Sequence, residues 1–240
     1  MKTLQLNIDY LSLADIQNFQ VLEELIYPDM YRNYYWSDEF SASYYITQAR
    51  AGFIAVTEQF EGHELLIPEI QYSYALLDFE NLHISRKVKK LLAHKQLKLE
   101  ISSDLDEVFE GINRSHTRSW FSEKYLETLK ATQEFPEDFH VISILIREEN
   151  RAVAGEIGYI IGATYTSLSG FSSAEKAYRN YGTAQLVLLA KHLQQEGFSF
   201  WNLGQPYMDY KLALGAKIYG REAFLERWFE AINLYPESSL

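Results

Sequence analysis

The sequence of 240 residues contains no cysteine. This absence excludes disulfide bonds, thiolate metal sites and a cysteine nucleophile, and it is typical of proteins from a reducing cytoplasm. Histidine is scarce as well, and because the six histidines show no His-x-x-x-His spacing we expect no bound metal. No apolar run approaches the roughly 18 residues that a membrane helix needs. We therefore expect a cytoplasmic protein without a membrane span.

Basic residues are also few in this sequence. The chain has 22 basic and 33 acidic residues and a net charge of −11, which argues against unspecific binding to a polyanion. Residues 86–98 are the exception, because this segment has six basic residues and no acidic one, which leaves 16 basic residues elsewhere. The six are Arg86, Lys87, Lys89, Lys90, Lys95 and Lys98. The segment indicates either a solvated helix face or a surface that contacts phosphates.

Hydrophobic periodicity predicts both helices and strands. Helical spacing covers residues 13–26, 41–51, 85–97, 104–113, 122–132 and 182–193, and Ser12, Ser85 and Ser122 are candidate N-caps. Strand patterns cover residues 52–56, 65–68, 72–77, 98–101, 140–146, 152–161, 164–169 and 198–203. We expect the last strand to run parallel to the strand before the long helix. Residues 1–80 are predicted to form a small N-terminal α+β subdomain, and residues 81–240 a larger domain.

The segment Arg179-Asn180-Tyr181-Gly182-Thr183-Ala184 opens the longest predicted apolar helix. It resembles the Arg/Gln-x-x-Gly-x-Gly/Ala pattern of the GNAT acyltransferase superfamily, where small residues let backbone N–H groups and the helix N-terminus face a pyrophosphate. The resemblance implies an α/β (α+β) fold with a GNAT-like mixed sheet flanked by helices. It also implies one possible function, an acyl-CoA-dependent N-acyltransferase. There Arg179, Gly182, Thr183 and Ala184 would bind the acyl-CoA co-substrate, and Tyr207 or Tyr210 could be the general acid.

A second resemblance, to the leucyl/phenylalanyl-tRNA–protein transferase family, covers residues 41–228. Leu82-His83-Ile84-Ser85-Arg86 matches the Leu-His-Ile-Ser-Arg motif of that family at all five positions. Gln205 precedes Leu214-Gly215-Ala216 by the spacing that separates the catalytic glutamine of the family from its Ser-Leu-Gly-Ala segment. Further similar segments are residues 49–53, Ser119-Trp120-Phe121, residues 154–158, Ser169-Gly170-Phe171-Ser172, and Arg221 with Phe224-Leu225.

This family resemblance implies an aminoacyltransferase that needs no cofactor. It would move an apolar amino acid of the Leu or Phe type from aminoacyl-tRNA to the N-terminal α-amine of a protein, a modification linked to protein degradation. Gln205, with Asn202 nearby, would carry catalysis, and Trp120 would stack on the terminal adenosine. Glu156, Ile157, Leu168, Ser169, Gly170, Phe171 and Ser172 would bind the donor, and Arg86, Lys87, Lys89 and Lys90 would hold tRNA phosphates. The partners are then aminoacyl-tRNA and the acceptor protein, and we expect a monomer.

Two carboxylates of the family are missing from the chain. Leu168 stands where the family has a glutamate, and Leu203 stands where it has the aspartate that polarises the glutamine. Asn202 is one residue away, but on the opposite face of a regular strand. These losses leave open a third class of function, a non-catalytic descendant that binds the ligand only. Gln205 could equally be a loop-capping amide, and Trp120 an anchor in the core.

Overall fold

The computed structural model describes residues 8–116, 119–135 and 139–236. Its α-helices are α1 Leu13–Gln17, α2 Phe19–Val21, α3 Ala42–Arg50, α4 Arg86–His94, α5 Asp106–Ser115, α6 Glu123–Thr132, α7 Tyr181–Gln195, α8 Asp209–Leu214 and α9 Arg221–Ala231. A π-helix covers Leu22–Ile26, and 3₁₀ turns cover Phe79–Asn81 and Lys176–Tyr178. The strands are β1 Asp9–Tyr10, β2 Tyr35–Trp36, β3 Ile54–Phe60, β4 His63–Glu69, β5 Ser73–Leu77, β6 Leu99–Ser102, β7 His140–Glu148, β8 Arg151–Ile161, β9 Thr164–Ser172, β10 Phe200–Asn202 and β11 Lys217–Gly220.

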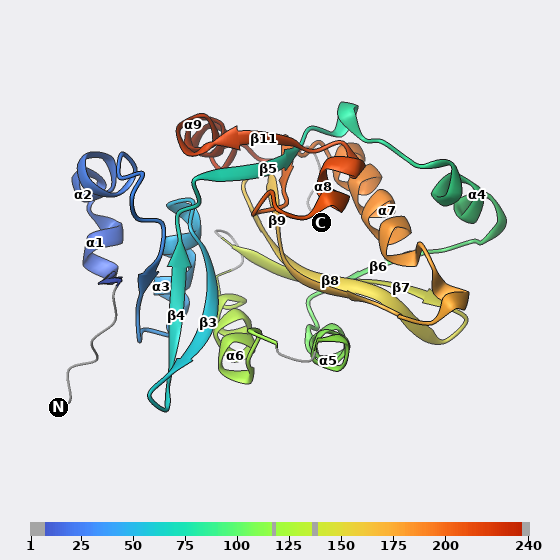
Figure 1. The fold of residues 1–240 in the computed structure, drawn as a ribbon, viewed down its shortest axis with the longest axis horizontal. Coiled ribbons are helices and arrows are strands. Elements are labelled where there is room, and N and C mark those ends of the chain that lie inside the picture. The colour runs from blue at the N-terminus through green and yellow to red at the C-terminus, as the bar shows by residue number, and fades with distance from the viewer. Residues whose placement is uncertain (1–7, 117–118, 136–138, 237–240) are drawn as a thin grey trace.

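A seven-stranded sheet with the order β11-β5-β10-β9-β8-β7-β6 forms the centre of the molecule. Strands β6 to β9 are an antiparallel meander, and β10 runs parallel to β9, as the sequence predicts. Strand β5 lies antiparallel between β10 and β11. Helices α5 and α6 lie on one side of this sheet and α7 and α4 on the other (Figure 1). The predicted fold class, a mixed sheet flanked by helices, is confirmed.

Several predicted helix starts are confirmed by side-chain caps. The hydroxyl of Ser12 accepts from the backbone of Asp15, whose carboxylate returns to Ser12, which makes a capping box. The hydroxyls of Ser85 and Ser122 cap α4 and α6 by accepting from the N–H of Val88 and of Tyr125. The continuous helix predicted over residues 13–26 is wrong, however. Helix α1 ends at Asn18, whose side chain accepts from two backbone N–H groups and caps the start of α2. A π-helix follows α2 directly.

The N-terminal part forms a second, smaller sheet of β3 and β4, beside a short parallel pair of β1 and β2. Strands β3 and β4 pair as a hairpin through Glu61 and Gly62, which both have positive φ, and Ser37 and Tyr34 bridge to β4 on its other side. Strand β5 precedes residue 80 but pairs inside the central sheet. The division into domains at residue 80 stays a prediction, and β5 belongs structurally with the residues that follow it.

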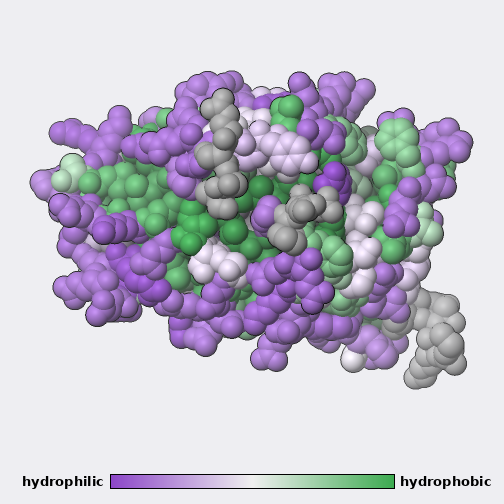
Figure 2. Space-filling view, turned by 180° about the vertical axis from the view of Figure 1, so that it is seen from behind, coloured by the Kyte–Doolittle hydropathy of each residue, from purple (hydrophilic) through white to green (hydrophobic). Residues whose placement is uncertain are grey.

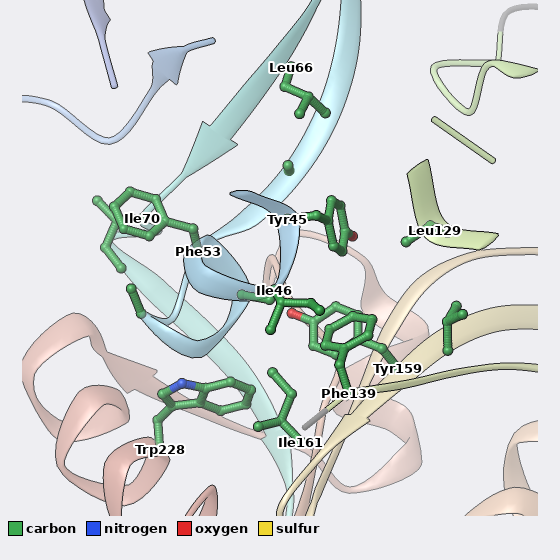
Figure 3. Close-up of a cluster of buried hydrophobic side chains, with 14 of the residues drawn as sticks. Tyr45, Ile46, Phe53, Leu66, Ile70, Leu129, Phe139, Tyr159, Ile161 and Trp228 are labelled. Carbon is green, nitrogen blue, oxygen red and sulfur yellow. The ribbon is translucent and has the colours of Figure 1, made fainter. Parts of the chain in front are cut away.

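One hydrophobic cluster joins the two sheets. Its aromatic side chains include those of α3, α6, β8 and α9, and Figure 3 shows Phe139 and Tyr159 packed against each other below Tyr45, with Phe53 to the left of Tyr45 and Ile161 and Trp228 lower down. The hydroxyls of Tyr45 and Tyr125 lie 2.6 Å apart, so even the polar ends of these rings are paired. The hairpin β3–β4 therefore packs as part of one body with the central sheet.

The surface behind the view of Figure 1 is not uniformly polar. Apolar side chains gather there in a band across the middle of the molecule, between polar margins (Figure 2). Within the described residues, no helix is both long enough and apolar enough to pass through a lipid bilayer.

Candidate functional site

Gln205 lies in the turn that follows β10, and three contacts fix the backbone of this turn. The side-chain oxygen of Asn202 accepts from the N–H of Gly204 at 2.9 Å, and the N–H of Ala75 donates to the carbonyl of Gly204 at 2.8 Å. Gly204 itself has a φ of +72°, a value that glycine adopts without strain. Asn202 is buried and its amide oxygen is engaged in this turn. Its observed role is therefore to hold the loop that presents Gln205.

A buried lysine supplies the third contact. The ammonium of Lys211, in α8, donates to the carbonyls of Leu203 and Gln205, the second at 2.7 Å. The side chain is only 5% exposed. Burial lowers the pKa of Lys211 to about 8, and the negative charge of Glu156 opposes this shift. The charge of Lys211 thus clamps both ends of the Leu203–Gln205 turn.

The amide of Gln205 points to a carboxylate that comes from the other sheet. Its Nε2 atom donates to Oε2 of Glu69, at the end of β4, at 2.6 Å, and it lies 3.4 Å from the hydroxyl of Tyr34. Asn33 donates to the second oxygen of Glu69 at 2.8 Å. Glu69 is 7% exposed, and burial raises the pKa of its carboxyl although these donors oppose the shift. The result is a half-buried glutamine held by a buried carboxylate.

Glu156 and Ile157, predicted to line one donor pocket, point to opposite faces of the sheet. Glu156 is 4% exposed and accepts hydrogen bonds from Tyr165, Ser167 and Gln185 at 2.8–3.1 Å. Ile157 packs in the cluster on the other face. The structure does not bring the two side chains together, because consecutive strand residues alternate between faces. Glu156 fastens α7 to the sheet, and its acceptor sites are largely occupied by protein donors.

The other predicted donor residues lie mostly on the face of Ile157. Leu168 and Phe171 pack against the same cluster, and a β-bulge at Leu168 separates the pairing of Ser167 from that of Ser169. The ring of Phe171 fills the space beside Gly111 and Gly155, where added Cβ atoms would lie 2.5–3.1 Å from it. The carbonyl of Gly170 is 3.1 Å from a ring nitrogen of His116. Ser172 is exposed at the end of β9.

Trp120 belongs to the same region. Its ring stacks on Phe121 with centroids 5.4 Å apart and meets Tyr125 edge-on at 5.3 Å. It is half-buried against the cluster that also contacts Leu168, Phe171 and Ile54, and Ile54 in turn approaches Gly204. A core-anchoring role for Trp120 is therefore visible, and its stacking on an adenosine stays a prediction.

The predicted tRNA-binding residues occupy a different part of the molecule. Helix α4 lies at the far end of the central sheet from the hairpin β3–β4 (Figure 1). Arg86, Lys87, Lys89 and Lys90 are all exposed, and none of them forms an ion pair with another described residue. Lys95, at the end of the same helix, pairs with Glu148. The four unpaired charges are thus free to meet phosphates, but at a distance from Gln205.

The residues of the GNAT-like turn line a pocket of about 470 Å³ at the N-terminus of α7. Arg179, Gly182 and Thr183 contribute to its wall together with Ser172, whereas Ala184 is buried beneath it. Asn180 takes the left-handed conformation, with a φ of +73°, where α7 begins. Tyr207 and Tyr210, the candidate general acids of the CoA hypothesis, are both exposed. The structure therefore gathers three of the four predicted CoA-binding residues.

Two motifs that are far apart in sequence pack directly on each other. The N–H of His83 donates to the carbonyl of Leu214 at 2.8 Å, and its ring lies 3.0 Å from the carbonyl of Ala213. Gly215 has a φ of +110°, and an added Cβ would lie 2.0 Å from the carbonyl oxygen of Asn81. Leu82–Arg86 and Leu214–Ala216 are thus complementary surfaces that set α8, and with it Lys211, against the sheet.

A family model described as leucyl/phenylalanyl-tRNA protein transferase matches residues 76–228, well over half of the chain. The chain belongs to this family. The matched region contains Gln205 and both motifs just described. Glu69, Asn33 and Tyr34 lie outside it, so the carboxylate that contacts the glutamine comes from a part of the chain that the family model does not cover.

Members of the leucyl/phenylalanyl-tRNA–protein transferase family are similar to the chain at low identity. The leucyl/phenylalanyl-tRNA–protein transferase of Pseudomonas fluorescens is 27% identical over 61% of this chain and 63% of its own length. Those of Paracoccus denitrificans and Citrobacter koseri are 23% and 29% identical, over 71% and 50% of their lengths. The chain thus matches less than two thirds of the Pseudomonas relative and half of the Citrobacter one.

Among solved structures, FemX aligns with a TM-score of 0.46 at 10% identity, covering 88% of this chain and 76% of its own. The C-terminal domain of a putative lysylphosphatidylglycerol synthetase from Agrobacterium fabrum aligns with a TM-score of 0.41 at 15% identity, over 77% and 54%.

Sequence reasoning on the family motifs missed Glu69 and Lys211. Glu69 lies 136 positions from Gln205 and carries no local signal beyond ending a strand after Pro68. Lys211 has a weak signal, because it is the only charged residue between Asp209 and Lys217 and lies shortly before the matched segment Leu214-Gly215-Ala216. The side chain of Leu203 is buried on the side of the central sheet that α7 covers. The carboxylate that contacts Gln205 is instead supplied by Glu69.

Proposed function

We propose that the protein is an aminoacyltransferase that moves an amino acid from aminoacyl-tRNA to the N-terminal α-amine of a protein. The observation that carries the proposal is Gln205, at the position of the family's glutamine, with its amide nitrogen held by Glu69. Its amide oxygen then remains to accept a hydrogen bond from the attacking amine. Charged tRNA as donor implies a cytoplasmic reaction, and the expected monomer without a cofactor remains part of the proposal.

The proposed step needs little covalent help from the protein, because the ester of aminoacyl-tRNA is already activated. The amine nitrogen forms a bond to the ester carbonyl carbon, the bond from that carbon to the ribose oxygen breaks, and the proton released by the amine ends on the ribose. Gln205 would orient the amine, and the enzyme would act mainly by positioning. The side chains of Ile157, Leu168 and Phe171 give one face of the sheet an apolar character that suits Leu or Phe as the donated residue.

A transfer assay tests this function directly. We expect the protein to move labelled Leu or Phe from charged tRNA to a peptide with N-terminal Arg or Lys. In Gln205→Ala the rate should fall about 10²-fold, because the amine loses its acceptor. Gln194→Ala, which removes an exposed glutamine from α7, should keep the wild-type rate. No transfer by the wild type would contradict the proposal, and tight binding of charged tRNA without turnover would support a non-catalytic binding protein.

The basic face of α4 gives a second prediction about the donor. Replacing Lys87, Lys89 and Lys90 by glutamine should weaken tRNA binding and reduce the steepness of log K against log salt by about 2–3. With fewer phosphate contacts, fewer counterions are released when the tRNA binds. Binding measured at several salt concentrations gives the slope. The exposed lysines Lys191 and Lys217 provide the control pair, whose replacement should leave it unchanged. An unchanged slope in the α4 variant would remove this helix from the tRNA interface.

The pocket at the start of α7 supports a second candidate, an acyl-CoA-dependent N-acyltransferase. Arg179 and the small residues Gly182 and Thr183 line it, and backbone N–H groups at a helix N-terminus favour anions. Calorimetry with acetyl-CoA separates the two functions. Saturable binding that Arg179→Ala weakens, together with no transfer from charged tRNA, would favour the CoA enzyme.

A further inference from the structure

The side chain of Glu69 is buried, and backbone contacts fix the end of β4 that carries it. The end of β4 is fixed by pairing of Glu69 with Ile54 on one side and by a bridge to Tyr34 on the other. The N–H of Ile70 also donates to the carbonyl of Asn33 at 2.8 Å. The backbone contacts therefore place the side chain of Asn33 beside the carboxylate. A substrate has little access to a carboxylate that is 7% exposed, so Glu69 acts through the residue that it holds.

The ionised carboxylate decides which way the amide of Gln205 faces. A carboxylate has only acceptor atoms, and an amide has two N–H donors on one atom and an acceptor oxygen on the other. Glu69 therefore selects the orientation in which Nε2 of Gln205 faces it at 2.6 Å. The same nitrogen is near the hydroxyl of Tyr34. Within the described part of the chain, no residue donates to the remaining amide oxygen of Gln205.

We propose that Glu69 is the positioning residue of the transfer site, and that it fixes Gln205 with the amide oxygen directed to the attacking amine. This inference rests on the proposed function. Glu69 supplies, from β4 in the second sheet, the carboxylate that is absent at Leu203. A neutral side chain at position 69 accepts and donates, so it permits both orientations of the Gln205 amide, and in one of them the amine meets N–H groups in place of an acceptor.

Protonation of Glu69 has the same effect as its replacement, because the neutral acid can donate to the amide oxygen of Gln205. Asn33, Tyr34, Gln71 and Gln205 face the carboxylate as hydrogen-bond partners, and Tyr74 and Arg221 are the further titratable or charged groups near it. Burial raises the pKa of Glu69 above its usual value. Activity should therefore be complete above this raised pKa and be lost as the pH falls through it.

The test compares Glu69→Gln with Glu64→Gln, which removes another carboxylate from β4 whose partner is Ser122. We expect kcat of Glu69→Gln to fall about 10²-fold, as for a misplaced catalytic group, while KM for charged tRNA stays constant and the acidic limb of the pH profile disappears. Glu64→Gln should retain the wild-type kcat and pH profile. The side-chain amide signal of Gln205 in ¹⁵N NMR, assigned by its loss in Gln205→Ala, should shift with pH in the wild type and not in Glu69→Gln.

The NMR measurement keeps this inference distinct from the proposed function. If the wild type transfers no amino acid, the function fails, and the amide titration alone decides whether Glu69 orients Gln205. An amide signal that does not respond to pH, or a Glu69→Gln variant with wild-type kcat and an unchanged acidic limb, would overturn the inference. Circular dichroism confirms that both variants are folded before rates are compared.

Discussion

Replacing Arg221 by methionine should lower the free energy of unfolding by about 3–5 kcal/mol, because several buried carbonyls lose their donor and each unsatisfied acceptor costs about 1–3 kcal/mol. Arg221 is 2% exposed. Its guanidinium donates to six backbone carbonyls, those of Ile26, Tyr27, Asp29, Arg32, Ile70 and Gln71. Methionine has a similar length but no donors, so these carbonyls lose their partner inside the protein. Urea unfolding gives the change as a lower midpoint.

Arg151→Met is the matched control for this substitution. Arg151 pairs with Glu175 on the surface, and both side chains are more than half exposed. Exposed ion pairs contribute about 0–1 kcal/mol, so its loss should hardly move the midpoint. Equal midpoints for the two variants would show that the carbonyl contacts of Arg221 contribute little. Because Arg221 holds Ile70 and Gln71 beside Glu69, its loss should also disturb the end of β4.

Gly215→Ala should destabilise the protein by about 3 kcal/mol, through backbone strain and a steric clash together. The residue has a φ of +110°, and the new Cβ would meet the carbonyl oxygen of Asn81 at 2.0 Å and the nitrogen of His83 at 3.2 Å. Neither backbone atom can rotate away as a side chain can. The clash would separate Leu82–Arg86 from Leu214–Ala216. Thermal or urea unfolding measures the loss.

Gly220→Ala tests whether the effect is specific to that contact. Gly220 is also near the C-terminal end of the chain, but it has a φ of −64° and no atom within 4 Å of an added Cβ. We expect a change below about 1 kcal/mol, the size of a changed helix N-cap. A similar loss in both glycine variants would contradict the close approach at Gly215.

Local signals in the sequence predicted the parts of the fold that depend on neighbouring residues. Ser85 and Ser122 predicted helix starts because an N-cap acts within four residues. The crossover from β9 through α7 to β10 followed from chain connectivity alone. Asn18 was missed because the regular apolar spacing continues across it, although its side chain caps a new helix. Such local competition between helix and cap leaves no trace in hydrophobic periodicity.

The candidate site was only partly predictable, because its charges come from distant segments. Gln205 was found through its spacing to Leu214–Ala216, but neither Glu69 nor Asn33 lies in a motif. Their meeting depends on how the hairpin β3–β4 packs against the central sheet, which no local pattern encodes. Glu156 was assigned to the same site as Ile157 because position in a motif says nothing about which face of a strand a side chain occupies.

The position of β5 between β10 and β11 has a consequence for the order of events during synthesis. Both neighbours of this strand are made more than 120 residues after it. While the chain emerges from the ribosome, β5 therefore has two unpaired edges, and unpaired edges invite association with other chains. The turn that carries Gln205 pairs with β5 through Ala75. The glutamine and the carboxylate can meet only after nearly the whole polypeptide has been translated, so a truncated chain would expose an open strand and have no assembled site.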